Sequence, residues 1–142
     1  METNIAVISK VIDFIEEHLT TDDLDLEEIA DAASYSKYHF HRMFLNIVGC
    51  TLHQYIQKRR LTEAAWQLVY TNKPIIDIAF MAGYETQQSF TLAFKRLYLE
   101  SPQLYRKSKN FWPIQVKFDK HKVKCISYTN LNMRCGGKVA WV

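Results

Sequence analysis

The sequence predicts an all-α protein in which a long helix joins two helix-turn-helix units and a short, basic, β-like tail follows. Three observations lead to this prediction. Apolar residues recur at helical spacing through most of the chain, a pattern of short helix, turn and longer helix occurs twice, and strand-like alternation is confined to residues 111–142. The chain has 142 residues, of which 48% are hydrophobic, so it can build the packed core of one domain or of two very small ones.

The chain opens with an amphipathic helix that ends in the polar run at residues 20–23. Its apolar residues recur at steps of three and four, and charged residues fill the other side. The apolar face consists of Ile5, Ile8, Val11, Ile12, Ile15 and Leu19.

The first helix-turn-helix unit is predicted at residues 25–48. It consists of a short helix over about 26–33 and a longer helix over about 37–48. Two capping residues, one capping-box partner and one terminating glycine mark these helices. In chain order they are Asp25, Glu28, Ser36 and Gly49.

The longest helix is predicted over residues 52–70, beginning after Thr51. Its 19 residues would span about 28 Å at 1.5 Å per residue. The side expected to be buried carries Leu52, Tyr55, Ile56, Leu61, Ala64, Ala65 and Leu68. Pro74 ends the connection that follows, because proline cannot continue a helix interior.

The second helix-turn-helix unit is predicted at residues 74–99, with a short helix over about 75–82 and a longer one over about 87–99. Thr86 can cap the longer helix, and Ser101 with Pro102 can begin a last helix over 102–107. The two units align at an offset of 49 up to the turn and 50 beyond it. The pairs include Ile29 with Ile78 and Tyr35 with Tyr84, then Phe40 with Phe90 and Phe44 with Phe94. A repeated helical hairpin of the solenoid kind is the alternative, but solenoids normally need three or more repeats.

The longer helix of each unit leaves a polar face opposite its buried phenylalanines. In the first unit this face carries Tyr38, His41, Arg42 and Leu45. In the second it carries Gln88, Thr91, Leu92 and Lys95, with Gln87 in the first turn. Arginine can bind guanine and glutamine can bind adenine through two hydrogen bonds each, so these faces are typical of base-reading helices. Two such helices read one face of DNA when they lie about 34 Å apart, a distance that the 52–70 helix and its flanking turns can span.

Several basic residues outside these faces are candidate phosphate contacts, which position a protein on DNA without reading sequence. They are Lys58, Arg59, Arg60, Lys73, Arg106 and Lys107. For the first three a solvated helix face is the alternative. Charge is also segregated along the chain. Residues 1–34 hold ten acidic and one basic residue and are expected to face solvent away from DNA, whereas residues 35–142 hold 17 basic and five acidic residues.

Over about residues 4–110 the chain resembles the AraC/XylS family of transcription regulators, most closely its small MarA/SoxS/Rob-like branch. The stretches that carry the resemblance are 26–30, 35–44, 54–61, 78–79, 83–84, 87–90, 94–95, 101–102 and 105–106. It implies seven helices in residues 1–110 that bind an asymmetric site as one chain, with bases read by Tyr38, His41, Arg42, Gln87, Gln88, Ser89 and Thr91. Ser36, Lys37 and Thr86 are expected at phosphates.

One departure from the family concerns Leu92, which stands where close relatives commonly carry an arginine. Base readout by the second unit is therefore expected to be weaker or to rest on Gln88 and Lys95. About 32 residues are too few for an independent core, so residues 111–142 either pack on the helical domain or begin a further domain. In Rob-like members a larger ligand-binding domain follows the DNA-binding module, so the second alternative is a truncated effector-binding domain. The resemblance also implies RNA polymerase as a partner and activation of transcription.

The sequence offers no convergent set of residues for catalysis, metal binding or a cofactor, so a non-enzyme without cofactors is expected. No stretch approaches the roughly 18 apolar residues of a membrane span, and the N-terminus lacks signal-peptide features. We expect a bacterial cytoplasmic protein associated with the nucleoid. The alternative function is a ligand-sensing or protein-interaction module with weak or vestigial DNA binding, which the acidic first helix and the β-like tail motivate; any small-molecule effector is left open.

Overall fold

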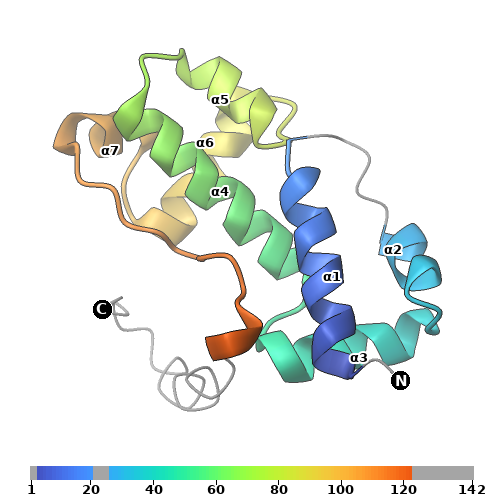
Figure 1. Ribbon diagram of the computed structural model, residues 1–142. Coiled ribbons are helices and arrows are strands. Elements are labelled where there is room, and N and C mark those ends of the chain that lie inside the picture. The colour runs from blue at the N-terminus through green and yellow to red at the C-terminus, as the bar shows by residue number, and fades with distance from the viewer. Residues whose placement is uncertain (1–2, 21–25, 123–142) are drawn as a thin grey trace.

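A computed structural model describes residues 3–20 and 26–122, and within them the chain forms seven α-helices and one short 3-10 helix (Figure 1). No strand occurs in this described part, which confirms the all-α prediction. In chain order the elements are α1 (Asn4–Glu17), α2 (Leu26–Ala32), α3 (Lys37–Val48), α4 (Leu52–Tyr70), α5 (Ile75–Met81), α6 (Gln87–Tyr98), α7 (Pro102–Ser108) and η1 (Lys120–Lys122).

Hydroxyl side chains begin most of these helices, because they satisfy N–H groups that have no partner within the helix. In each case the hydroxyl oxygen accepts a hydrogen bond from the backbone N–H three residues on. The capping residues are Thr3, Ser36, Thr51, Thr86 and Ser101. Gly49 ends α3 with a left-handed backbone, as the sequence predicts. The predicted cap at Asp25 lies outside the described residues.

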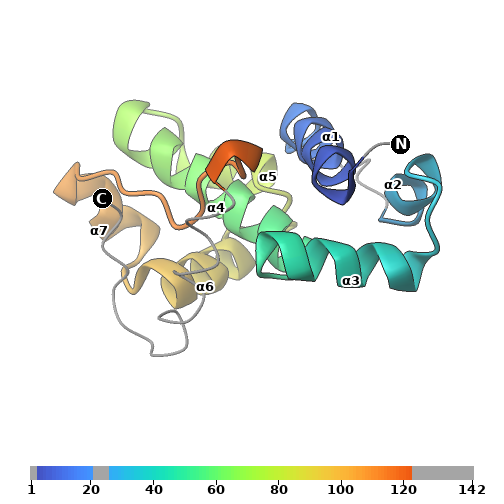
Figure 2. The same cartoon turned by 60° about the horizontal axis from the view of Figure 1, so that its bottom comes forward.

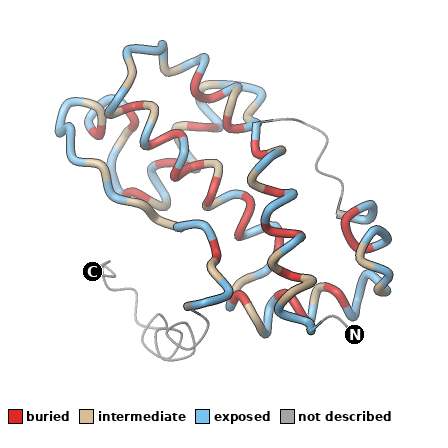
Figure 3. The backbone as a smooth tube through the Cα atoms, viewed as in Figure 1, coloured by how far each residue is buried: buried red, intermediate tan, exposed pale blue. Residues whose placement is uncertain are grey.

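The helices enclose two apolar cores that share α4. The N-terminal half of α4 contributes Leu52, Tyr55 and Ile56 to the first core, which also contains residues of α1, α2 and α3. Its C-terminal half contributes Leu61, Ala64, Ala65 and Leu68 to the second core, with residues of α5, α6 and α7. Figure 3 shows buried positions spread along the whole of α4. One straight helix therefore holds both helix-turn-helix units.

The first helix of each unit ends in the same backbone arrangement, a Schellman motif. Tyr35 N–H donates to Ala30 O and Tyr84 N–H donates to Ala79 O, over 3.3 and 3.1 Å. The residue before each tyrosine has a positive φ, 60° at Ser34 and 85° at Gly83. The repeat found in the sequence is therefore a repeat of turn geometry as well.

Residues 111–119, which we call the strap, run from α7 back along α4 to the first unit (Figure 1). Phe111 and Ile114 pack against the second core, whereas Phe118 is buried in the first. Of the residues whose alternation suggested a strand, Phe118 is buried and Ile114 is half-buried, but Val116 is 45% exposed. The three therefore do not form one buried face, and they form no β-ladder. The other predicted strand residues, 123–142, lie outside the described part.

Candidate nucleic-acid interface

The two longer helices of the units, α3 and α6, both lie along the lower edge of the molecule in Figure 2. Each buries its phenylalanines against its own core, Phe40 and Phe44 in α3 and Phe90 and Phe94 in α6. The opposite face of each helix is consequently left to solvent.

The exposed face of α3 carries an aromatic side chain and a cation in contact. Tyr38 is 72% exposed, and the guanidinium carbon of Arg42 lies 5.6 Å from the centre of its ring. Arg42 Nη1 is also 3.5 Å from the Tyr38 hydroxyl. Leu45 extends this face, while His41 is half-buried beside Phe40. The contact with Tyr38 holds the Arg42 guanidinium on the exposed face of α3.

The exposed face of α6 carries both polar and apolar side chains, with little charge near the start of the helix. Gln87, Gln88, Thr91 and Leu92 line a shallow open hollow on this face, and Leu92 is 62% exposed. Lys95 is exposed one turn further along. Ser89 is engaged within the helix start, because its hydroxyl oxygen is 2.9 Å from both the hydroxyl and the carbonyl oxygen of Thr86. Glutamine amides are therefore the main hydrogen-bonding groups that α6 presents.

The start of α3 combines a cap with an ion pair. The Ser36 hydroxyl accepts from His39 N–H over 3.2 Å, and Lys37 Nζ lies 2.9 Å from Glu27 Oε1 of α2. Both members of this pair are exposed. The acidic N-terminal block was expected to face away from the candidate interface, but Glu27 contacts a residue expected to bind phosphate.

Arg59, expected at a phosphate, lies in the interior instead. It is 7% exposed, and its guanidinium binds both carboxylate oxygens of Glu16 over 2.7 and 2.9 Å. It also contacts Glu63 Oε1 at 2.9 Å and Gln115 O at 2.8 Å. Burial lowers the pKa of Arg59, but the hydrogen bond and charge of Glu16 outweigh it, and the pKa is raised. Arg59 joins α1, α4 and the strap, and this position does not support a phosphate contact.

Arg60 and Arg106 also bind backbone carbonyls within the protein. Arg60 Nε donates to Leu19 O over 2.8 Å, and Arg106 donates to Leu68 O over 3.0 Å and Lys73 O over 2.6 Å. Both arginines cap carbonyl groups at the C-terminal ends of helices, a favourable place for a cation. We therefore leave them out of the proposed phosphate contacts.

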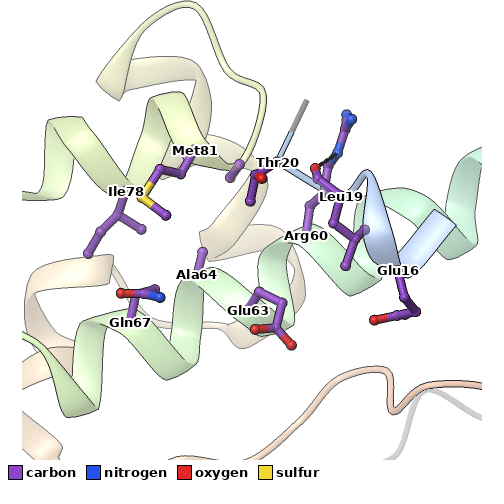
Figure 4. A pocket seen from close by; sticks show the side chains of 10 residues that line it. Glu16, Leu19, Thr20, Arg60, Glu63, Ala64, Gln67, Ile78 and Met81 are labelled. Atoms are coloured by element: carbon purple, nitrogen blue, oxygen red, sulfur yellow. Dashed lines mark hydrogen bonds between the residues drawn. The ribbon is translucent and has the colours of Figure 1, made fainter. Parts of the chain in front are cut away.

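Arg60 forms part of the wall of a hollow of about 250 Å³ between α1, α4 and α5. Figure 4 shows its side chain reaching from α4 toward Leu19 and Thr20, while Gln67 lies at the other end. The Gln67 Oε1 atom is buried there and has no hydrogen-bond partner. The hollow separates α1 from the start of the second unit without opening onto α3 or α6.

The basic residues predicted at phosphates that keep an outward position are lysines. Lys73 and Lys107 are exposed and Lys58 is half-exposed. Lys73 Nζ is 3.9 Å from Met81 Sδ, a weak contact that a phosphate oxygen could readily displace. None of the described helices combines the length and the apolar character that a membrane crossing requires.

A polar stripe on α4 that was not predicted from the sequence faces the strap. Tyr55, Arg59 and Thr62 follow one another at steps of four and three residues, so they lie on one side of the helix. All three are buried, and each binds a backbone group of the strap. Polar residues at this spacing beside an apolar stripe were the available signal, because buried polar groups need partners.

Comparison with known proteins agrees with this geometry. A family model described as "Helix-turn-helix domain" matches residues 29–108. The activator AarP of Providencia stuartii is 44% identical over 103 residues, 72% of this chain and 76% of that protein. The multiple antibiotic resistance protein MarA of Salmonella typhimurium is 38% identical over 104 residues, 73% of this chain and 81% of that protein.

Other relatives are longer. An uncharacterized transcriptional regulator of Bacillus subtilis, YbfP, is 43% identical over 99 residues, and this chain covers 33% of its length. Among solved structures, the C-terminal domain of AraT, a response regulator from Geobacillus stearothermophilus, matches with a TM-score of 0.68 at 30% identity, over 81% of this chain and 95% of that one. The DNA-binding domain of AdpA, solved with a target DNA, matches with a TM-score of 0.65 at 25% identity, over 71% and 90%.

Proposed function

Since this chain belongs to the AraC-type family of helix-turn-helix transcription regulators, we propose that it binds double-stranded DNA as a single chain, with α3 and α6 in successive major grooves. The base-reading residues proposed for α3 are Tyr38, His41 and Arg42. Those proposed for α6 are Gln87, Gln88, Ser89, Thr91 and Lys95. The two half-sites would lie about ten base pairs, or one helical turn, apart.

The observation that supports this function most directly is the pair of outward polar faces on α3 and α6, held by one continuous helix. The N-terminal ends of α3 and α6 also present backbone N–H groups beside Ser36 and Thr86, an arrangement that favours a phosphate. Four lysines complete the proposed backbone contacts: Lys37, Lys58, Lys73 and Lys107. This set is smaller than the sequence suggested, because three arginines are engaged inside the protein.

The test is selection of bound duplexes from a random library, followed by a salt titration of the best duplex. We expect an asymmetric site with two half-sites about one helical turn apart. Four phosphate contacts by lysine predict a slope of about −4 in a plot of log affinity against log salt concentration. Selection of no sequence, together with a flat salt response, would favour the ligand-sensing or protein-interaction alternative.

We also propose that DNA-bound protein contacts RNA polymerase and activates transcription in the bacterial cytoplasm, at the nucleoid. The name of AarP as a transcriptional activator supports this proposal, and this chain covers most of that protein's length. Transcription in vitro from a promoter that carries the selected site tests it. More transcript with the protein than without it is expected, and less transcript would indicate repression.

A further inference from the structure

We propose that the strap, residues 111–119, is a clamp that fixes the position of α3 relative to α6 and so sets the spacing of half-sites that the protein accepts. The inference deepens the proposed function and rests on it. The family model ends at residue 108, so it assigns no role to this segment.

The strap connects both cores. Phe118, 7% exposed, is an integral part of the first core. Phe111 and Ile114 lie against the second. The two cores otherwise share α4, so the strap is a second, separate connection between the units (Figure 1). Two connections restrict bending and twisting far more than one helix alone.

Side chains of the helices, and not other strands, supply the hydrogen-bond partners of backbone groups in the strap. In the second unit, Trp112 N–H donates to the Tyr105 hydroxyl over 3.0 Å and the Tyr98 hydroxyl donates to Trp112 O over 3.2 Å. Burial raises the pKa of both tyrosines, so they remain neutral donors and acceptors at physiological pH. This end of the strap is thereby fixed to α6 and α7.

The other end is fixed to α4 and the first unit. Gln115 N–H donates to Thr62 Oγ1 over 3.0 Å, and Phe118 N–H donates to the buried Tyr55 hydroxyl over 3.0 Å. Gln115 O accepts from Arg59, which also holds Glu16 of α1. Lys117 Nζ of the strap also lies 2.7 Å from Asp13 Oδ1 of α1. The strap therefore contacts α1, α4, α6 and α7 through specific groups, more than a passive linker to a following segment requires.

The function follows from the demands of DNA geometry. Two recognition helices bind together only when their separation and rotation match the helical repeat, and a shift of one base pair rotates a half-site by roughly 34°. A rigid protein accepts one spacing, whereas a protein that bends at α4 accepts several. The strap would then determine spacing without contacting DNA.

The test compares affinities for duplexes whose half-sites are ten base pairs apart with those whose spacing is changed by one or two. Tyr55→Phe removes the hydroxyl that accepts from Phe118, and Phe118→Ala removes the anchor itself. Val116→Ala, an exposed strap position, is the matched control. We expect the parent and the control to prefer one spacing at least tenfold, and the two strap variants to lose most of that preference while retaining affinity for an isolated half-site.

An equal loss of affinity at every spacing, or an unchanged preference, would overturn the clamp. Circular dichroism verifies folding, and Tyr55→Phe decides if Phe118→Ala does not fold. A measurement without DNA separates this inference from the proposed function. Spin labels at Leu45→Cys and Leu92→Cys, with the native cysteines replaced by serine, should give a narrow distance distribution in the parent and a broader one in strap variants. Equal widths would also refute the clamp, whatever the DNA results.

Discussion

The turns of both helix-turn-helix units have the same Schellman geometry, yet the two units are fixed to α4 in different ways. In the second unit, α5, α6 and α7 enclose an apolar half of α4. In the first, α1 is joined to α4 by the ion pair of Glu16 with Arg59 as well as by apolar contacts. Their outer faces differ too, since α3 presents Arg42 with Tyr38 whereas α6 presents amides and Leu92. We therefore expect the two units, although they share one fold, to contribute unequally to base discrimination, with more from the first unit.

The attachment of the first unit should be the most sensitive point. We expect Arg59→Met to lower the free energy of unfolding by about 3–5 kcal/mol, because it leaves the half-buried Glu16 carboxylate without its partner. Urea denaturation followed by circular dichroism measures this. Lys58→Met, at the neighbouring position, is the control and should change stability by less than about 1 kcal/mol. Equal small losses in both variants would mean that apolar packing alone attaches the first unit.

The unequal outer faces predict unequal losses of DNA affinity. Arg42→Ala should cost about 1–3 kcal/mol of binding free energy, because it removes the strongest base-edge donor proposed for α3. Leu92→Ala should cost less than about 1 kcal/mol, because a leucine offers at most apolar contact with a thymine methyl group. Fluorescence anisotropy on the selected duplex measures both.

The reverse substitution sharpens the same point. Leu92→Arg should strengthen binding to duplexes that carry guanine in the second half-site, because it places an arginine at the position of α6 that corresponds to Arg42 of α3. If Leu92→Ala weakens binding as much as Arg42→Ala does, the two units contribute equally and the proposed asymmetry is wrong.

The two turns predict opposite effects on stability at equivalent positions. At Gly83, φ is +85° and an added Cβ would lie 3.0 Å from Arg60 Nη1, so Gly83→Ala should destabilise by about 1–2 kcal/mol. Ser34 already has a side chain at a φ of 60°, so Ser34→Gly should be neutral or stabilise by up to about 1 kcal/mol. Thermal unfolding compares the two variants.

An additional variant separates two contributions to the cost of Gly83→Ala, the positive φ and the contact with Arg60. If contact with Arg60 contributes, Gly83→Ala should cost less in an Arg60→Ala background than in the parent. A Gly83→Ala variant as stable as the parent would show that the second turn tolerates a side chain as the first one does.

The helix boundaries could be predicted because their signals are local. Ser36, Thr86 and Gly49 determine where helices begin and end through bonds to residues three or four positions away. The role of Arg59 could not be predicted this way, because Glu16 and Gln115 lie 43 and 56 residues from it in the chain. A basic residue has the same sequence signature whether its partner is a phosphate or a distant carboxylate.

The strap shows the same limit for apolar residues. Ile114, Val116 and Phe118 recur at a spacing of two, which is typical of a strand. The pattern reveals neither that Val116 is exposed nor whether the neighbour is another strand or a helix. The neighbour is helix α4, because the strap forms hydrogen bonds to Tyr55 and Thr62, which lie more than 50 positions away in the chain. The base-reading residues on α3 and α6 stay predictions, since exposure permits a contact with DNA without demonstrating one.

The smallest expected effect concerns the ion pair between α2 and the start of α3 in the first unit. Within the described residues, α5 and α6 of the second unit form no equivalent pair. Glu27 and Lys37 form an exposed pair, with side chains 69% and 59% accessible, so the pair stabilises the fold by at most about 1 kcal/mol. Its effect on DNA binding should exceed its effect on stability. Glu27→Gln should raise DNA affinity about two- to fivefold at low salt, because it removes a charge that attracts Lys37 and repels phosphate, and high salt should diminish the gain.

Glu28→Gln, which removes the same charge one residue away, is the matched control for this prediction. A gain confined to Glu27→Gln would indicate that the ion pair itself restrains Lys37. Equal gains in both variants would indicate only long-range repulsion between α2 and DNA. No gain in either would argue against a phosphate contact by Lys37, and the first unit would then depend on its α3 face, with Arg42 at its centre, for affinity as well as for discrimination.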